Sequence, residues 1–243
     1  MVLVTGGSGF LGAHFLAHLT QKHGRIRALF RNPKRLENVR EVFTYYFEDP
    51  KSYFDKIDWV QCDLNDILIL TEALNDITEV YHVAGLINFE WRRQRELKKT
   101  NTIGTANLVN CCLAAKVEKL CYISSIAALG HNSSAQAEDP FEYPSFNEPY
   151  GLTKYGGELE VLRGAQEGLK ILILRPGVIL GEGFWRSGSG FLLKFVSTEP
   201  KWYPPGGTGF VDVKDVVQFA IRLMEQENDA LSLTLVGHNM SYL

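Results

Sequence analysis

A short apolar strand at the start of the chain runs directly into a glycine-rich turn and an amphipathic helix. Met1–Thr5 is the strand, TGGSGFLG spans the turn, and the apolar stripe of the helix follows at once. Glycines at this spacing let the backbone and the first turn of a helix approach a pyrophosphate closely. They are not followed by Lys-Ser or Lys-Thr, which excludes a P-loop. We therefore predict a dinucleotide-binding turn, with contacts from Gly6, Gly9, Phe10, Leu11 and Gly12.

The rest of the chain alternates short β-branched runs with longer amphipathic runs. This alternation is typical of βαβ units, in which helices cover both faces of a parallel sheet. We expect residues 1–243 to form a single α/β domain, a Rossmann-type, doubly wound parallel sheet of about seven strands. The expected strands are Met1–Thr5, Arg25–Arg31, Asp58–Cys62, Glu79–Val83, Lys119–Ser124, Lys170–Arg175 and Ser232–Val236.

Two irregular stretches, at residues 130–149 and 181–209, follow the C-terminal ends of strands. Open α/β sheets bind their ligands at this edge. The last residues, 237–243, have the pattern of a turn that enters a helix and then stops. We expect a small, truncated C-terminal substrate-binding part, with substrate loops near 181–209 and 237–243.

The charge balance and the hydropathy pattern exclude some partners. A formal net charge of −3 and the absence of a long basic run argue against nucleic-acid binding and favour a small molecule. No apolar run is long enough to cross a bilayer, and no targeting segment precedes the first strand. The sequence therefore predicts a cytoplasmic protein without a membrane partner.

A metal site is not predicted. The cysteines lack metal-ligand spacing and lie in apolar segments, as reduced core cysteines do, although the adjacent pair could also be a redox couple. They are Cys62, Cys111, Cys112 and Cys121. His14 and His18 have the spacing of a helical metal pair but no recognisable third ligand, so we expect them on a solvated helix face.

The residue that ends the second strand is basic. In dinucleotide-binding folds, an acidic residue about 20 positions after the glycines binds the adenosine ribose of NAD. Arg31 stands there instead, and a guanidinium suits a 2′-phosphate better than a neutral diol. Asn32, Lys34 and Arg35 add donors nearby. We predict NADP as the cofactor; the alternatives are NAD and a solvated basic turn without a binding role.

Two further strand ends carry candidate contacts to the dinucleotide. Asp63, followed by Leu64, either approaches the adenine amino group or caps the next helix. Ala84 and Gly85 follow the next strand, where small residues let the backbone pass close to a cofactor. We expect His82, in that strand, to be a packed residue rather than a catalyst, because no partner acid is identifiable.

The most informative pattern is YGLTK, at Tyr150–Lys154, which follows the strand end Ser124-Ser125 along the chain. On a helix, Tyr150 and Lys154 share one face, which places an ammonium near a phenol. A free phenol titrates near pH 10, and a neighbouring cation favours the phenolate. Tyr150 is therefore a candidate acid–base group.

In these motifs the sequence resembles the extended short-chain dehydrogenase/reductases, which include dihydroflavonol reductase-like enzymes and the nucleotide-sugar epimerases and dehydratases. The likeness covers almost the whole chain. The matching segments, in the family's order, are Thr5–Gly12, Asp63-Leu64, His82–Gly85, Asn101–Thr105, Ser124-Ser125, Tyr150–Lys154, Arg175–Val178 and Phe210–Val213.

The resemblance implies a role for each matching residue. Tyr150 would exchange a proton with the substrate, Lys154 would lower the pKa of Tyr150 and hold the nicotinamide ribose, and Ser125 would hydrogen-bond the substrate oxygen. Ser124 is the alternative to Ser125, which is preferred because Ile126–Gly130 aligns with the family segment after the catalytic serine. Asn101 would support this network. The segment with Pro176 and Val178 would pass beside the nicotinamide.

The resemblance also implies a homodimer, in which the helices near residues 105–116 and 150–164 pair across a two-fold axis. Arg31 points to the reductase branch, where NADPH reduces a carbonyl. We predict an NADP-dependent carbonyl reductase acting on a small-molecule carbonyl. The alternatives are an NAD-dependent epimerase or dehydratase acting on a nucleotide sugar, and a dinucleotide-binding regulator without turnover, against which the intact serine, tyrosine and lysine count.

Overall fold

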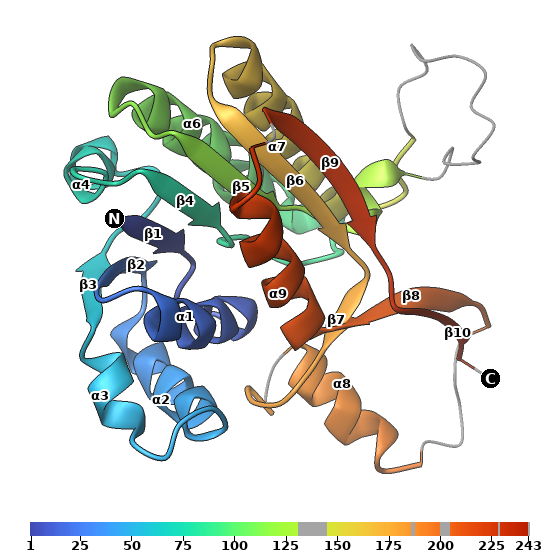
Figure 1. The fold of residues 1–243 in the computed structure, drawn as a ribbon. Coiled ribbons are helices and arrows are strands. Elements are labelled where there is room, and N and C mark those ends of the chain that lie inside the picture. The colour runs from blue at the N-terminus through green and yellow to red at the C-terminus, as the bar shows by residue number, and fades with distance from the viewer. Residues whose placement is uncertain (131–144, 186–187, 200–204, 228, 243) are drawn as a thin grey trace.

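The computed structural model describes residues 1–130, 145–185, 188–199, 205–227 and 229–242. The parts of the predicted loops at 131–144, 186–187 and 200–204, and residue 243, lie outside the described residues. Seven parallel strands form the main sheet, in the order β3-β2-β1-β4-β5-β6-β9 (Figure 1). They are β1 (Val2–Thr5), β2 (Ile26–Phe30), β3 (Ile57–Gln61), β4 (Glu79–His82), β5 (Lys119–Ile123), β6 (Lys170–Pro176) and β9 (Ala230–Leu235). The predicted Rossmann-like α/β sheet is confirmed.

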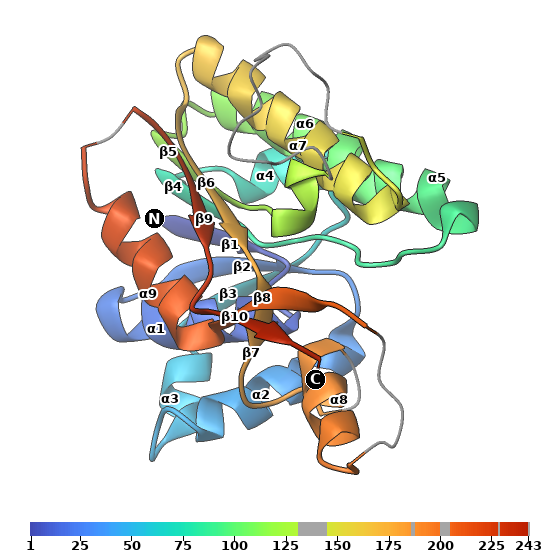
Figure 2. The same ribbon diagram turned by 90° about the vertical axis from the view of Figure 1, so that its right-hand side faces the viewer.

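Helices cover both faces of this sheet, as Figures 1 and 2 show from two sides. One face carries α1 (Phe10–Lys22), α2 (Leu36–Thr44), α3 (Pro50–Phe54) and α9 (Val213–Met224). The other carries α4 (Ile67–Ala73), α6 (Gly104–Ala114) and α7 (Pro149–Gln166), with α5 (Gln94–Leu97) beside them. Alternate residues of each strand enter the two layers: Val2 and Val4 pack under α1, whereas Leu3 packs on the opposite face.

The helix starts follow from local sequence. Asp66 caps α4 by accepting a hydrogen bond from Ile69 N, and Asp212 caps α9 in the same way. Glu148 caps α7 just before Pro149, the residue type most favoured at the first helical position. Short helical turns complete the connections: η1 (Pro33–Arg35), η2 (Trp91–Arg93), η4 (Ile126–Leu129) and the π-helical η3 (Lys98–Ile103).

A second, three-stranded sheet lies in the C-terminal part of the chain. Its order is β10-β8-β7, formed by β7 (Val178–Leu180), β8 (Gly207–Asp212) and β10 (His238–Ser241). The prediction that residues 237–243 enter a helix is wrong, because His238–Ser241 pairs with β8 in antiparallel register, from His238 opposite Phe210 to Ser241 opposite Gly207. That pairing joins segments far apart in sequence, which local periodicity does not report.

The segment 181–209, expected to be irregular, contains a helix as well. This helix is α8 (Gly188–Val196), and the first residues of β8 follow near the end of the segment. Its sequence, GSGFLLKFV, begins with glycines and is then almost continuously apolar, so the 3.6-residue alternation that marks an amphipathic helix is absent. None of the helices in the described part of the chain is long and apolar enough to cross a membrane.

Candidate active site

The turn between β1 and α1 is built so tightly that only glycine fits it. Gly6 has φ +68°, and a Cβ there would lie 2.7 Å from the Ala84 backbone. A Cβ on Gly12 would lie 2.2 Å from the carbonyl oxygen of Gly6, to which Gly9 N donates a hydrogen bond of 2.9 Å. Thr5 Oγ1 accepts a hydrogen bond from Ala84 N, which ties the segment after β4 to the end of β1.

The N-terminus of α1 is open to an anion. Its N-cap, Gly9, makes no side-chain cap, and no acidic residue lies in the first turn, which begins with Phe10 and Leu11. The free N–H groups and the positive end of the helix dipole therefore face outward without a partner from a capping side chain. Together with the glycine cradle, this arrangement fits the pyrophosphate of a dinucleotide.

Arg31 lies directly after β2, and Asp63 lies just after β3, the neighbouring strand. Arg31 Nη1 and Asp63 Oδ2 are 3.8 Å apart, and both side chains are about half exposed. Partial burial works against the charged form of Asp63, but hydrogen bonds from Asn65 and the charge of Arg31 lower its pKa. Asp66 caps α4, so the alternative that Asp63 caps this helix is wrong. Leu64, the next residue, is buried.

Ser125 and Tyr150 meet across the end of β5 and the start of α7. The side chain of Ser125 interacts with that of Tyr150, and Ser125 Oγ accepts a hydrogen bond of 3.2 Å from Ala127 N. Burial raises the pKa of Tyr150 to about 12, and the charge of Glu148 adds to this, while the Ser125 hydrogen bond opposes it. This direction is opposite to the one expected from the sequence, and it means that the phenol carries its proton at neutral pH.

Lys154 lies one turn further along α7 and is buried, with 3% of its surface exposed. Its Nζ donates a hydrogen bond of 2.7 Å to the carbonyl oxygen of Ile123 and lies 4.1 Å from the ring centroid of Tyr122. Burial lowers the pKa of Lys154 to about 7, and the charge of Glu158 opposes this. Lys154 is therefore held by β5, on the same side of α7 as Tyr150.

Asn101 joins the loop after β4 to α7. It lies in the π-helical turn η3 and is almost fully buried. Its Oδ1 accepts a hydrogen bond of 2.8 Å from Leu86 N, and its Nδ2 donates to Leu86 O and to Thr153 Oγ1. A Cβ on Gly85 would lie 3.6 Å from Asn101 Oδ1 and 4.0 Å from Lys154 Nζ. The structure thus brings Ala84-Gly85, Asn101 and Lys154 to one place, beside the glycine turn.

The remaining predicted residues lie nearby at the same edge of the sheet. Ser124 is buried, and within the described residues its Oγ has no hydrogen-bond partner, whereas Ser125 contacts Tyr150. Pro176 ends β6, the strand beside β5, and Val178 begins β7. His82 is a packed strand residue, as predicted: it is fully buried between the hydroxyls of Thr5 and Thr105.

His14 corrects a prediction. It is fully buried rather than solvated, with Nδ1 2.6 Å from Tyr46 Oη and Nε2 3.0 Å from the carbonyl oxygen of Glu182. Because a carbonyl only accepts, Nε2 carries the hydrogen and the Tyr46 hydroxyl donates to Nδ1.

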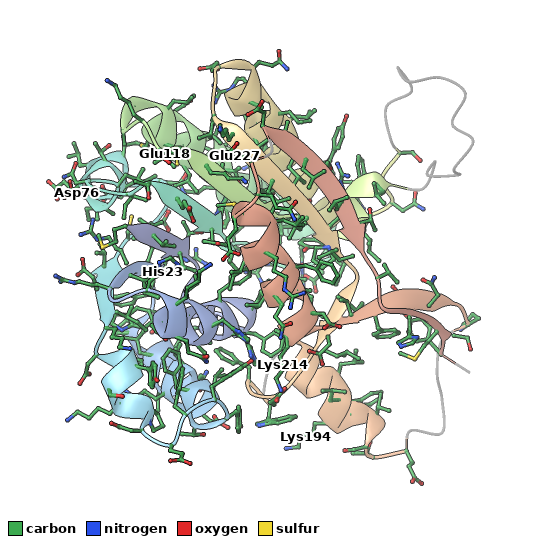
Figure 3. All side chains as sticks on the ribbon, in the orientation of Figure 1. His23, Asp76, Glu118, Lys194, Lys214 and Glu227 are labelled. Carbon is green, nitrogen blue, oxygen red and sulfur yellow. The ribbon has the colours of Figure 1, made fainter. Side chains whose placement is uncertain are left out.

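Lys214, labelled at the start of α9 in Figure 3, forms an ion pair with Glu182, whose carbonyl oxygen contacts His14; the Lys214 Nζ and Glu182 Oε1 atoms are 2.6 Å apart. Among the described residues, no cluster of three or more histidine, cysteine, aspartate or glutamate side chains is placed to hold a metal ion.

Sequence reasoning missed several residues that shape the site. Glu148 accepts hydrogen bonds from the backbone N–H groups of Tyr150 and Gly151, and the ring of Phe89 packs edge-on against Tyr150 at 5.7 Å. Glu158 forms a buried ion pair with Arg175. Only two local signals point to these residues: Glu148 precedes a proline at a helix start, and Glu158 is four positions after Lys154.

Comparisons with known proteins agree with this arrangement. The profile of the NAD dependent epimerase/dehydratase family matches residues 2–234. A Synechocystis sp. protein named "Putative dihydroflavonol 4-reductase" is 30% identical over 237 residues, which are 94% of this chain and 64% of that protein. Tetraketide alpha-pyrone reductase 2 of Arabidopsis thaliana is 27% identical over 241 residues, 92% of this chain and 74% of its own length.

A solved structure shares the whole fold. MoeE5 in complex with UDP-glucuronic acid and NAD superposes with a TM-score of 0.79 at 27% identity, over 99% of this chain and 78% of MoeE5. The chain thus spans about two thirds to four fifths of the length of these three proteins. With a family match over nearly all of its length, the chain belongs to the NAD dependent epimerase/dehydratase family, the extended short-chain dehydrogenase/reductases that bind NAD(P).

Proposed function

We propose that this protein is an NADP-dependent carbonyl reductase that converts a ketone or aldehyde to an alcohol. The observation that carries the proposal is the placement of Ser125 against Tyr150, with the buried Lys154 one helical turn away. A dinucleotide regulator without turnover has no use for a protonated phenol and a buried ammonium beside its glycine turn. These groups favour an enzyme.

Each residue has a defined task in the proposed reaction. Ser125 donates a hydrogen bond to the carbonyl oxygen, and Tyr150, protonated at neutral pH, transfers its proton to that oxygen as negative charge develops. The charge of Lys154 then stabilises the phenolate that remains. Asn101 fixes the loop at Leu86 and the helix at Thr153, so that Gly85 and Lys154 keep their relative positions.

The bound dinucleotide would supply the hydride, and residues at the C-terminal edge of the sheet would hold it. Lys154 would also bind the nicotinamide ribose. The residues proposed to contact the dinucleotide are Gly6, Gly9, Phe10, Leu11, Gly12, Arg31, Asp63, Leu64, Ala84, Gly85, Tyr150, Lys154, Pro176 and Val178.

NADP is proposed over NAD because of Arg31. Its exposed guanidinium ends β2, in the place where an acid would bind the ribose of NAD, and can reach a 2′-phosphate. The half-exposed Asp63 carboxylate, 3.8 Å away, makes only a weak ion pair with it, so Arg31 is available to a phosphate.

The loop after β4 favours an apolar carbonyl substrate. It exposes Ile87, Phe89 and Trp91, by 64%, 63% and 49%, and Phe89 touches the ring of Tyr150. Exposed apolar side chains this close to a proton donor are suited to an apolar ligand. The two guanidiniums on the loop each pair with a carboxylate, Arg92 with Glu90 and Arg93 with Glu96. Two relatives are named as reductases.

The second candidate is an NAD-dependent epimerase or dehydratase acting on a nucleotide sugar. Its support is the likeness to MoeE5, whose structure contains UDP-glucuronic acid and NAD. The family to which the chain belongs is named for the same two activities.

A homodimer and a cytoplasmic location are part of the proposal. Leu159 and Leu162 on α7 and Ile103 beside α6 are 42–46% exposed, whereas Val161 and Leu108 face the sheet. Three exposed apolar residues on adjacent helices suit a two-fold helix pairing. All four cysteines are buried and unpaired, which supports a reducing compartment.

The test is a substrate screen of the purified protein with NADPH and NADH. The panel contains aromatic and aliphatic aldehydes, cyclic ketones and nucleotide sugars. We expect NADPH to be oxidised with apolar carbonyl compounds. Conversion of a nucleotide sugar with no net change in the dinucleotide would overturn the reductase proposal in favour of the epimerase.

A further inference from the structure

A buried ion pair lies on the catalytic helix, one turn beyond Lys154. The carboxylate of Glu158 receives two hydrogen bonds from Arg175, from Nε at 2.8 Å and from Nη2 at 2.6 Å. The Glu158 side chain is 3% exposed and that of Arg175 is 19% exposed. A bidentate, charge-assisted pair of this kind fixes the position of the carboxylate.

The surroundings of Lys154 contain several titratable groups. Tyr122 of β5 offers its ring face to the ammonium, His82 of β4 is near enough for the charge of Lys154 to lower its pKa, and Tyr150 shares the helix face. Glu158 is the anion that favours the charged form of Lys154. Within the described residues no carboxylate forms a direct ion pair with Lys154.

The ion pair with Arg175 lets Glu158 act on the charge of Lys154 without forming a direct ion pair with it. A free Glu158, four residues from Lys154 on the same helix, could rotate to form a direct ion pair with it. Such a pair would draw Nζ away from the carbonyl oxygen of Ile123 and from Gly85, beside which it now lies. Because Arg175 on β6 holds both carboxylate oxygens, Glu158 supplies its negative field without capturing the ammonium.

We propose that Glu158, locked by Arg175, is a positioning residue that favours the charged form of Lys154 and leaves its ammonium free to act in the active site. The inference rests on the proposed function for its catalytic consequence, because only a charged Lys154 stabilises the phenolate of Tyr150. The electrostatic part concerns the protein alone and can be measured without substrate or cofactor.

The experiment is an NMR titration of the Lys154 side chain in the whole protein, with its signal identified by its loss in Lys154→Ala. Glu158→Gln removes the anion and leaves the Arg175 charge unpaired, so we expect the titration midpoint of Lys154 to fall by about one pH unit or more. The double variant Glu158→Gln/Arg175→Met removes both charges and should give a smaller fall. The double variant can also be titrated if the single variant does not fold, since it leaves no unpaired buried charge.

Glu160→Gln is the matched control. Glu160 lies two residues further along α7 and pairs with Arg163 at 3.0 Å, but this pair is about one third exposed. Its loss should leave the titration of Lys154 unchanged. A midpoint that stays put in both Glu158 variants, or that moves equally in Glu160→Gln, would overturn the inference.

The pH profile of turnover gives the second measurement. In Glu158→Gln the alkaline limb of kcat should move to lower pH together with the NMR midpoint. A shifted NMR midpoint without any turnover by the unsubstituted protein, on any carbonyl or nucleotide sugar, would support the electrostatic inference and count against the proposed function. An unmoved NMR midpoint in a protein that is active as a reductase would support the proposed function and overturn the electrostatic inference.

Discussion

The guanidinium of Arg31 lies 3.8 Å from the carboxylate of Asp63, where β2 and β3 end side by side. The two groups are 57% and 47% exposed, so the pair contributes little to stability and either partner can be drawn to a ligand. Asp63 therefore competes with a 2′-phosphate for Arg31.

This pair predicts the choice of cofactor. NADPH should bind more tightly than NADH, and Arg31→Ala should remove most of the difference, because one charge-assisted contact is worth about tenfold to a hundredfold in affinity. Asp63→Asn should increase the preference for NADPH, since it frees the guanidinium. Fluorescence titration with both dinucleotides measures this, and equal affinities in the unsubstituted protein would rule out the NADP assignment.

The glycine turn gives a prediction about stability and binding together. Gly12→Ala places a methyl group 2.2 Å from Gly6 O, so we expect a loss of roughly 1–3 kcal/mol in the free energy of unfolding and weaker dinucleotide binding. Gly24→Ala is the control, because a Cβ there meets nothing within 4 Å. Urea unfolding and dinucleotide titration of both variants check the prediction; equal behaviour of the two would contradict it.

Local sequence was enough to predict the main sheet. The expected strand Arg25–Arg31 is observed as Ile26–Phe30, and Ser232–Val236 as Ala230–Leu235, because short runs rich in apolar residues between polar segments mark strands clearly. The glycine turn and the Tyr150–Lys154 spacing were also predictable, since each depends on residues within one turn or one helix. The second sheet was not, because β8 pairs with two strands distant in sequence.

The buried polar contacts escaped prediction for the same reason. The partners of His14 lie 32 and 168 residues further along the chain, and Arg175 is 17 residues from Glu158 on a different element. A helical pattern shows that a residue faces inward but does not show which polar group it meets there. The direction of the pKa shift at Tyr150 likewise depends on burial, which the motif alone does not reveal.

The exposed leucines of α7 predict the oligomeric state. Leu159→Lys and Leu162→Lys together should convert a dimer to a monomer, because two charges would be buried at the helix pairing. Leu68→Lys is the control, since Leu68 is 79% exposed on α4, away from α7. Sedimentation at micromolar concentration measures the outcome, and a monomeric unsubstituted protein would contradict the dimer.

Two buried histidines predict loss of stability in acid. Burial lowers the pKa of His82 from 6.5 to about 3, with the charge of Lys154 adding to this, and lowers that of His14 to about 4. Below pH 6.5 the unfolded chain takes up protons that the folded chain does not, so their contribution to stability is full above pH 6.5 and is lost as the pH falls toward 4 and 3.

Urea unfolding at several pH values between these limits tests the effect. Each histidine should change the free energy of unfolding by about 1.4 kcal/mol per pH unit at most. His14→Gln should therefore make this free energy depend less steeply on pH. The same slope in the variant and the unsubstituted protein would show that His14 titrates alike in the folded and unfolded states.

The turnover of Tyr150→Phe is the most direct test that Tyr150 is the proton donor. Phe keeps the ring and its packing against Phe89 but removes the only group at this position that can give a proton to the substrate oxygen. We expect kcat to fall by about a hundredfold or more with dinucleotide affinity nearly unchanged, whereas Lys154→Ala should weaken both. A Tyr150→Phe protein that kept most of its kcat would show that the proton comes from another group, and the assignment of α7 as the catalytic helix would be wrong.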